Sequence, residues 1–346
     1  MKMTHDFRRF FLTAGAALLG ICAIARIGAA SYHEVFSFAE VAGTTGSRFN
    51  YGAAVDADAV YFSLNSSPAI TKIDGSGTSI IMTSADWAAA STKTTLTSFY
   101  GFESMGDYLV FGESSADQIW KVEKATGAIS VVASTADIEA VTGFSATQLL
   151  AAKGVCGDDY YFYEGESDGI LKVNVPTGVV STVATAAQLD AFASSTGVAG
   201  GLACDGAGQL HVGDNTNDAI YKWDGTSGFS VLSTAEILAV TGADSAGFGD
   251  MLFGEDGLMY FYETTSDGIL SFDPLNPAAS LRFVLTEDQL LSGPMGSDNI
   301  SGLAWYDGNI AFTGMGQYGF YVVPEPTVLG LLLGIAGLAL LRSRRA

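Results

Sequence analysis

Apolar and polar residues recur along this chain in a pattern with a period of about 50 residues. Each copy contains a short strand-like run of alternating character that starts at a large hydrophobic residue, which serves as a landmark. The landmarks are Ile70, Ile119, Ile170, Ile220, Ile269 and Phe320, and they lie 49, 51, 50, 49 and 51 residues apart. A fixed period of this length indicates a repeat architecture.

Within one unit the pattern predicts four short strands. A Gly-containing strand such as 201–204 precedes an Asp-Gly turn, an aromatic strand such as 160–163, an alternating strand such as 220–224 and a last strand such as 129–132. Strands with turns roughly every 8–12 residues indicate an all-β fold, and four of them make one propeller blade. Hydroxyl caps predict short helices between blades, and these caps are Ser134, Ser233 and Thr286.

The ends of the repeat predict how the ring closes. The sixth unit, residues 303–323, is too short for a whole blade, while residues 32–40 match an outermost strand and the helix start that follows it. We therefore expect residues 31–323 to form a six-bladed β-propeller in which Val35 to Phe38 pair with the strand around Tyr318 to Val322. This closure removes exposed sheet edges.

The first 30 residues have the order of a signal peptide with its short helix. Arg8 and Arg9 precede an apolar run over 10–24, and Gly28 to Ala30 offer small residues for cleavage before Ser31. The paired arginines leave both the general secretory and the twin-arginine route open. An uncleaved membrane anchor is the alternative.

The C-terminal segment 324–346 combines three features in order. Val323-Pro324-Glu325-Pro326 leads into an apolar run over 327–341, which is followed by a basic tail, 342–346, that contains Arg342, Arg344 and Arg345. The apolar run predicts a transmembrane helix of roughly 22 Å, shorter than the roughly 30 Å hydrocarbon core. Terminal arginines would keep its end on the cytoplasmic side.

This order closely resembles the PEP-CTERM sorting signal of Gram-negative bacteria. The resemblance implies recognition by an exosortase, cleavage near the Pro-Glu-Pro segment, and delivery to the outer surface after transient membrane anchoring. Such proteins occur in organisms that make exopolysaccharide, biofilm or flocs. The implied partners are the exosortase, the export machinery, and exopolysaccharide or envelope proteins. A plain C-terminal anchor is the alternative.

The body also carries a family resemblance. Residues 210–224 look like a blade of the NHL-repeat family, and residues 31–323 more loosely resemble the gluconolactonase-like six-bladed propellers. That likeness implies a metal in the central channel, although the Glu-Gly-Pro opening segment of that family is missing. Such a likeness specifies fold better than function.

Breaks in the repeat point to the channel. Most blades have Gly near the start of the inner strand, and blade five has Asp250 instead; Asn50, Glu103, Lys153 and Asn299 lie at nearby positions. Oxygens of Asn50, Asp250 and Asn299 could converge on calcium or another divalent cation. Solvated channel side chains without a metal are the alternative, and the one we favour.

The net charge of the body limits the classes of partner that it can bind. The chain has a formal net charge of −21, and residues 31–326 hold 9 basic and 36 acidic residues, a net of −27. Such a body repels phosphate backbones, which argues against nucleic-acid binding.

Some of these acids recur at the same place in four blades. The pairs are Glu113/Asp117, Glu164/Asp168, Asp214/Asp218 and Glu263/Asp267. A calcium site in each blade is one interpretation. We favour a structural one, in which the acids accept N–H bonds and fix turns, because a site that serves function usually breaks a repeat.

Cysteine and histidine are scarce. Outside the leader only Cys156, Cys204, His33 and His211 remain, which argues against a zinc site and a histidine-based triad. An oxidising compartment would allow a disulfide between Cys156 and Cys204. We expect two buried thiols instead, because Cα atoms on neighbouring inner strands must come within about 7 Å to be bridged.

These observations favour a non-enzymatic surface or matrix protein whose propeller binds a ligand or partner. A metal-dependent lactonase or related hydrolase is the competing class. A third is a carbohydrate-binding adhesin that uses the Tyr-rich runs 160–163 and 260–262, although half of each run must face the sheet interior.

Overall fold

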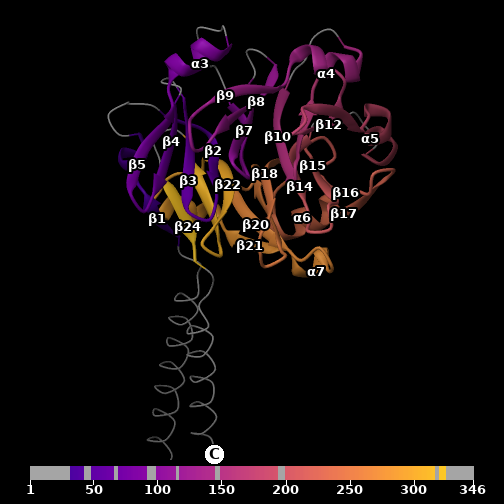
Figure 1. Cartoon of the computed structure of the whole chain (residues 1–346). Helices are drawn as coiled ribbons and strands as arrows, with labels where there is room; N and C mark the ends of the chain where they lie inside the picture. The colour runs from indigo at the N-terminus through magenta and orange to yellow at the C-terminus, as the bar shows by residue number, and fades with distance from the viewer. Residues whose placement is uncertain are drawn as a thin grey trace, which may run out of the picture. The chain divides into compact units, whose positions relative to one another are not determined.

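The computed structural model describes residues 32–42, 48–65, 69–91, 99–113, 117–144, 149–193, 199–315 and 319–324. Residues 33–322 form one compact unit. In it, six antiparallel sheets of four strands surround a central axis (Figure 1). The predicted six-bladed β-propeller is therefore confirmed.

The strands follow the chain outward from the channel in each of the first five blades. Those of blades one to three are β2 (Arg48–Val55), β3 (Ala59–Asn65), β4 (Ala69–Asp74), β5 (Gly77–Met82), β6 (Phe99–Met105), β7 (Tyr108–Glu113), β8 (Gln118–Glu123), β9 (Ile129–Ala133), β10 (Leu149–Cys156), β11 (Asp159–Glu164), β12 (Gly169–Asn174) and β13 (Val179–Ala184). Those of blades four and five are β14 (Ala199–Cys204), β15 (Leu210–Asp214), β16 (Ala219–Trp223), β17 (Gly228–Leu232), β18 (Phe248–Phe253), β19 (Met259–Glu263), β20 (Gly268–Phe272) and β21 (Arg282–Leu285).

Blade six joins the two ends of the body. It is built from β22 (Ile300–Tyr306), β23 (Asn309–Gly314), β24 (Phe320–Val323) and, as its outermost strand, β1 (His33–Phe36). His33 pairs with Val322 and Phe36 with Phe320, so closure by the N-terminal strand is confirmed. The strand lies two residues earlier than predicted, because Ser37 already caps the following helix: the Ser37 N–H donates to Glu40 Oε2 at 2.7 Å.

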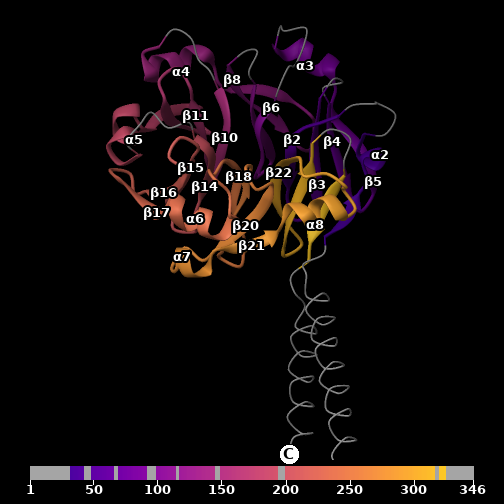
Figure 2. The ribbon, with the colours of Figure 1, turned by 180° about the vertical axis from the view of Figure 1, so that it is seen from behind.

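Short helices connect successive blades, as predicted. They are α2 (Phe38–Ala42), α3 (Ser84–Ser91), α4 (Thr135–Thr142), α5 (Ala186–Ala193), α6 (Thr234–Thr241) and α8 (Glu287–Ser292), with α2 and α8 best seen in Figure 2. A further short helix, α7 (Pro277–Ser280), lies within blade five between β20 and β21. In α4 the Asp137 N–H donates to Ser134 Oγ at 3.2 Å, and the Ser134 N–H donates to Asp137 Oδ2 at 2.9 Å. This reciprocal capping satisfies N–H groups that a helix start leaves free.

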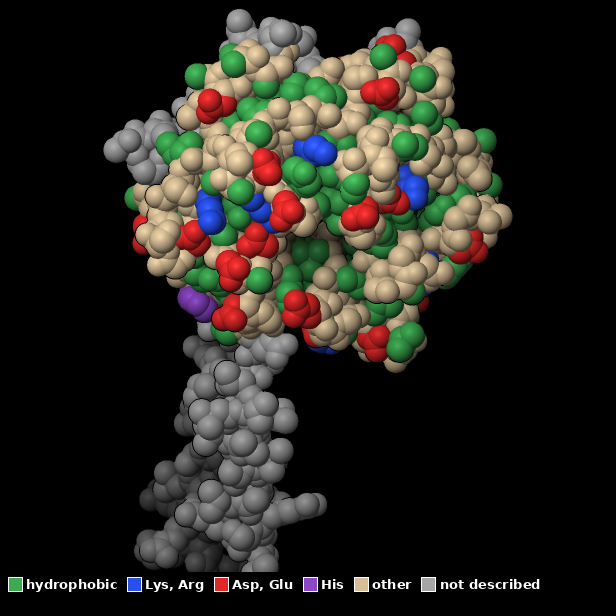
Figure 3. Space-filling view, viewed as in Figure 1, with side chains coloured by type: hydrophobic (Ala, Val, Ile, Leu, Met, Phe, Trp, Pro, Cys, Tyr) green, Lys and Arg blue, Asp and Glu red, His purple; other side chains and the backbone are tan. Residues whose placement is uncertain are grey.

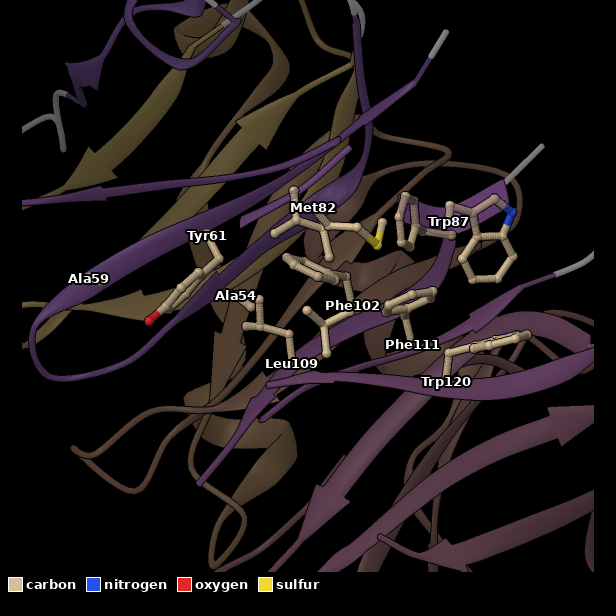
Figure 4. Packing of buried hydrophobic residues seen from close by; sticks show 12 residues of the cluster. Ala54, Ala59, Tyr61, Met82, Trp87, Phe102, Leu109, Phe111 and Trp120 are labelled. Carbon is tan, nitrogen blue, oxygen red and sulfur yellow. The ribbon is translucent and has the colours of Figure 1, made fainter. Parts of the chain in front are cut away.

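Aromatic side chains fill the space between blades. Between blades one and two, Trp87 of α3 packs on Trp120 with ring centroids 4.5 Å apart (Figure 4). Within blade two, Phe99 packs on Phe111 with ring centroids 4.3 Å apart. Such pairs contribute about 0.5–1.5 kcal/mol each beyond their buried area. The helix therefore seals the outer end of the interface between two blades.

The predicted signal helix (1–30) and sorting helix (327–341) lie outside the described residues, as do the sorting residues Glu325, Pro326, Arg342, Arg344 and Arg345. Val323 ends β24 and Pro324 follows it. Among the described helices, none is long and apolar enough to cross a membrane.

Candidate functional site

The first strands of the six blades line the central channel, and glycine lets them approach one another. A Cβ on Gly302 would lie 2.8 Å from the Cα of Gly52, and one on Gly201 would lie 2.5 Å from the carbonyl oxygen of Gly249. Contacts this short leave no room for a side chain. Packing therefore requires glycine at these two positions, while Gly52 and Gly101 have positive φ angles of 94° and 58° that favour glycine.

Asp250 occupies the corresponding position in blade five. Its Oδ2 accepts the N–H of Leu303 in blade six at 2.8 Å, and its Oδ1 accepts the N–H of Met251 at 3.0 Å. The carboxylate thus reaches across to the next blade. It places a carboxylate in the middle of the channel wall, at the position where the other blades have glycine.

Two chambers meet at Asp250. The helix-side chamber, about 260 Å³, is lined by Gly101, Gly200, Gly201, Gly249, Asp250, Tyr262, Thr264, Asn299, Ile300, Ser301, Gly302 and Met315. The turn-side chamber, about 200 Å³, is lined by Ala53, Val55, Glu103, Asp250, Met251, Leu252, Phe253, Leu303, Ala304 and Trp305. The two chambers lie at opposite ends of the first strands. Ile300, in the helix-side chamber, begins β22, whereas Val55 and Phe253, in the turn-side chamber, end β2 and β18.

The predicted channel-metal residues are brought together only in part. Asp250 and Asn299 both line the helix-side chamber, but the side chains of Asn50 and Lys153 lie outside the described residues. Both Asp250 oxygens already accept backbone N–H groups, and the Asn299 amide donates to Ser297 Oγ at 3.3 Å. Calcium takes six to eight oxygen ligands. The described side chains of this chamber fall well short of that number.

The recurrent acids hold turns together, as the structural interpretation predicted. Glu164 accepts the N–H groups of Glu166 and Ser167 at 3.0 and 2.8 Å. Asp214 accepts those of Thr216 and Asn217 at 2.8 and 3.1 Å, and Glu263 accepts those of Thr265 and Ser266 at 3.0 and 2.6 Å. Each of these carboxylates is almost fully buried.

The second acid of each pair has a separate role. Asp117, Asp168, Asp218 and Asp267 all have positive φ angles of 47–52°. Aspartate tolerates this left-handed conformation better than most residues. In two blades a tyrosine hydroxyl also donates to it: Tyr163 to Asp168 at 2.8 Å and Tyr262 to Asp267 at 2.9 Å.

One acidic cluster joins parts of the chain that are distant in sequence. Carboxylate oxygens of Asp267, Glu287 and Asp298 all lie within 4.8 Å of one another. These oxygens could hold a divalent cation. Asp267 was visible as a repeat position, but nothing in the sequence pairs it with the α8 helix and the segment before β22.

Cys156 and Cys204 correct an expectation. The prediction of two free thiols is wrong, because the Cα atoms of these residues are 5.7 Å apart and their sulfur atoms form a disulfide. The distance lies within the usual 4.4–6.8 Å or so of bridged cysteines. Gly154 explains the approach, since a Cβ there would meet Leu202 of the next blade at 3.3 Å.

The tyrosine runs belong to the core. Residues 160–163 are at most 8% exposed, and so are Tyr260 and Tyr262. Their rings are therefore not free to stack on a ligand at the propeller surface, which removes the sequence basis for the adhesin interpretation.

The turns between first and second strands, predicted as Asp-Gly turns, carry an acid in every blade. These residues are Asp56, Asp58, Asp107, Asp158, Asp205, Glu255, Asp256 and Asp307. Asp56 pairs with Lys124 and Asp205 with Lys222, each at 2.9 Å. Because first strands line the channel, these turns surround the mouth of the turn-side chamber. Figure 3 looks onto a face with a central hollow, hydrophobic inside and edged by acidic side chains.

Comparisons with known proteins support the fold. No protein-family model matches the chain, and no curated protein does. Among solved structures, virginiamycin B lyase from Staphylococcus aureus is 14% identical, with a TM-score of 0.55 over 84% of this chain and 98% of that one.

Two further solved structures have similar scores. A streptogramin B lyase is 13% identical, with a TM-score of 0.57 over 85% of this chain and 98% of that one. A protein of unknown function from Bacteroides thetaiotaomicron is 12% identical, with a TM-score of 0.57 over 84% of this chain and 74% of that one. At such identity the likeness supports the propeller fold alone.

Proposed function

We propose that this protein is exported across the inner membrane and sorted to the cell envelope, where its propeller binds a ligand in the central channel without transforming it. Asp250 carries the binding part of the proposal. It is the point at which a glycine series is replaced by a charged side chain, and both chambers meet there. A break in a repeat at a cavity favours a role in binding over one in packing.

Export is supported by the ends of the sequence and by the disulfide. The signal-peptide pattern of residues 1–30 and the PEP-CTERM-like segment 324–346 address the protein to the secretory route and to an exosortase. Disulfides persist in oxidising compartments and are rare in the cytosol of mesophilic organisms. A close Cys156–Cys204 pair therefore fits a protein that works outside the cytoplasm.

A metal-dependent lyase or lactonase is the second candidate, because Asp250 and Asn299 share one chamber and the similar structures include lyases. A virginiamycin B lyase with a histidine-to-alanine change is described as catalytically inactive. Here His33 is exposed on the outermost strand of blade six and His211 is fully buried, and neither lines a described chamber. This difference favours binding over catalysis.

A ligand screen tests the binding proposal. Thermal shifts of the protein would be measured against sugars, polyols, organic acids, amines, lactones and esters, beside a metal analysis and an assay for product. We expect a stabilising ligand whose effect is weakened in the Asp250→Asn variant and unchanged in Glu166→Gln, an exposed acid in a loop between second and third strands. Turnover of a lactone or ester that depends on a bound metal would replace this proposal with the hydrolase. Finding no ligand that depends on Asp250 would also reject it.

A further inference from the structure

The turn-side chamber has walls of an unusual mixture. Val55, Leu252, Phe253, Leu303 and Trp305 contribute apolar and aromatic side chains to its lining. Glu103 and Asp250 add two carboxylates to the same lining, and none of the described residues that line it is basic.

Tyr160 lies close to the two carboxylates of the chamber. Tyr160 is fully buried, and its hydroxyl donates to the carbonyl oxygen of Gly101 at 2.7 Å. Burial first, and then the charges of Glu103 and Asp250, raise the pKa of Tyr160 well above its ordinary value. Glu103 and Asp250 therefore both lie near the buried hydroxyl of Tyr160.

The mouth of the chamber adds a second source of negative potential. Six of the turn acids are exposed: Asp58, Asp107, Asp158, Glu255, Asp256 and Asp307. Lysines pair with Asp56 and Asp205 instead. A ring of one sign of charge around a cleft raises the local concentration of oppositely charged ligands.

We propose that the turn-side chamber binds a small organic cation, an ammonium or guanidinium group attached to an apolar body. This proposal names the ligand class for the binding function proposed above and rests on it. The cationic group lies in the field of Glu103 and Asp250 and against the indole ring of Trp305, and the apolar body lies against Phe253. A cation over an indole face gains additional stabilisation.

Size and chemistry separate this ligand from the alternatives. The chamber of about 200 Å³ has room for roughly seven water molecules, or for an alkyl- or arylamine of comparable volume. A metal ion is disfavoured because Glu103 and Asp250 are the only carboxylates among the described lining residues and both Asp250 oxygens already accept N–H groups. Anions are opposed by both sets of acids.

Paired probes of equal shape and different charge test the proposal. Binding of benzylammonium and butylammonium to the full chain would be measured by calorimetry beside benzyl alcohol and 1-butanol. We expect the cations to bind at least about tenfold more tightly than the neutral isosteres, and more weakly as salt rises. The source of the cation is tested with two further probes, Nα-acetyl-lysine amide, which keeps its side-chain ammonium group, and a short peptide that contains the same lysine. Tighter binding of the peptide than of the amide would assign the ligand to a side chain of a partner protein.

Matched variants locate the site. Trp305→Leu should weaken cation binding about three- to thirtyfold, while Phe229→Leu, an exposed aromatic on an outer strand, should not. Asp307→Asn keeps its left-handed backbone and should weaken binding about twofold at low salt, while Glu166→Gln should have no effect. Equal binding of benzyl alcohol, no cation binding at millimolar concentration, or wild-type affinity in Trp305→Leu would each overturn the inference. A ligand of another class that depends on Asn299 in the helix-side chamber would leave the binding function standing.

Discussion

His211 provides a direct test of the packing between blades four and five. Its side chain has no exposed surface, and neither ring nitrogen has a hydrogen-bond partner of ordinary geometry among the described residues. The ring packs edge-on against Phe253 with centroids 5.0 Å apart. Burial, and then the charge of Lys222, lower the pKa of His211 from 6.5 to about 4, outweighing Asp205 and the backbone of Gln209.

The consequence for stability has a definite sign. The folded protein keeps His211 neutral, whereas the unfolded chain binds a proton there below about pH 6.5. The free energy of unfolding therefore falls as pH decreases from about 6.5 to about 4. Each pKa unit corresponds to about 1.4 kcal/mol, so the loss approaches about 3 kcal/mol. Carboxylates such as Asp137 and Asp224, whose pKa values are lowered by hydrogen bonds, lose their contribution only at still lower pH.

Urea unfolding at pH 7.5, 6.5, 5.5 and 4.5 would measure this loss. We expect His211→Leu to remove most of the decrease, because leucine fills a similar volume and leaves no group to protonate. His33→Gln, which removes the exposed histidine of β1, should keep the wild-type pH dependence. If His211→Leu and wild type lose equal stability between pH 7.5 and 4.5, the buried neutral histidine is the wrong explanation.

Three further predictions concern stability. Replacing both Cys156 and Cys204 by serine should lower the free energy of unfolding by about 2–4 kcal/mol, measured by urea unfolding, and reduction of the wild type should reproduce that loss. Asp218→Ala should cost about 1 kcal/mol at its φ of 52° and Asp218→Gly little, and equal losses in the two variants would reject the backbone explanation. Millimolar calcium should raise the melting temperature no more than sodium chloride of matched ionic strength, since the recurrent acids accept N–H groups. A calcium-specific rise lost in Asp298→Asn would instead assign a site to the Asp267–Glu287–Asp298 cluster.

The fold could be read from the sequence because a propeller blade is a local unit. The spacing of the landmark residues and the turn residues between them lie within single blades, so each copy reports on the same geometry. The exact register of β1 could not be read in the same way. Phe38 continues the apolar pattern, yet Ser37 and Glu40 form a cap that takes it into α2.

The site was less accessible to sequence reasoning, because it depends on distances between blades. Asp250 stood out as a break in the glycine pattern, but its hydrogen bond to Leu303 joins different blades. The Cys156–Cys204 distance likewise depends on how closely glycines bring the first strands together. The Asp-Gly turn after each first strand was predicted from the sequence, but the position of its acids around a channel mouth required the structure.

The intact mass of the protein recovered from its native cell envelope tests the central claim of an exported and sorted binding protein most directly. We predict a mature chain that lacks residues 1–30 and the tail beyond the Pro324-Glu325-Pro326 segment. It should also be two hydrogen atoms lighter than the reduced form, because Cys156 and Cys204 are joined. Most molecules retaining Arg345, or retaining residues 1–30 with both thiols free, would contradict the account and point to an anchored or cytoplasmic protein instead.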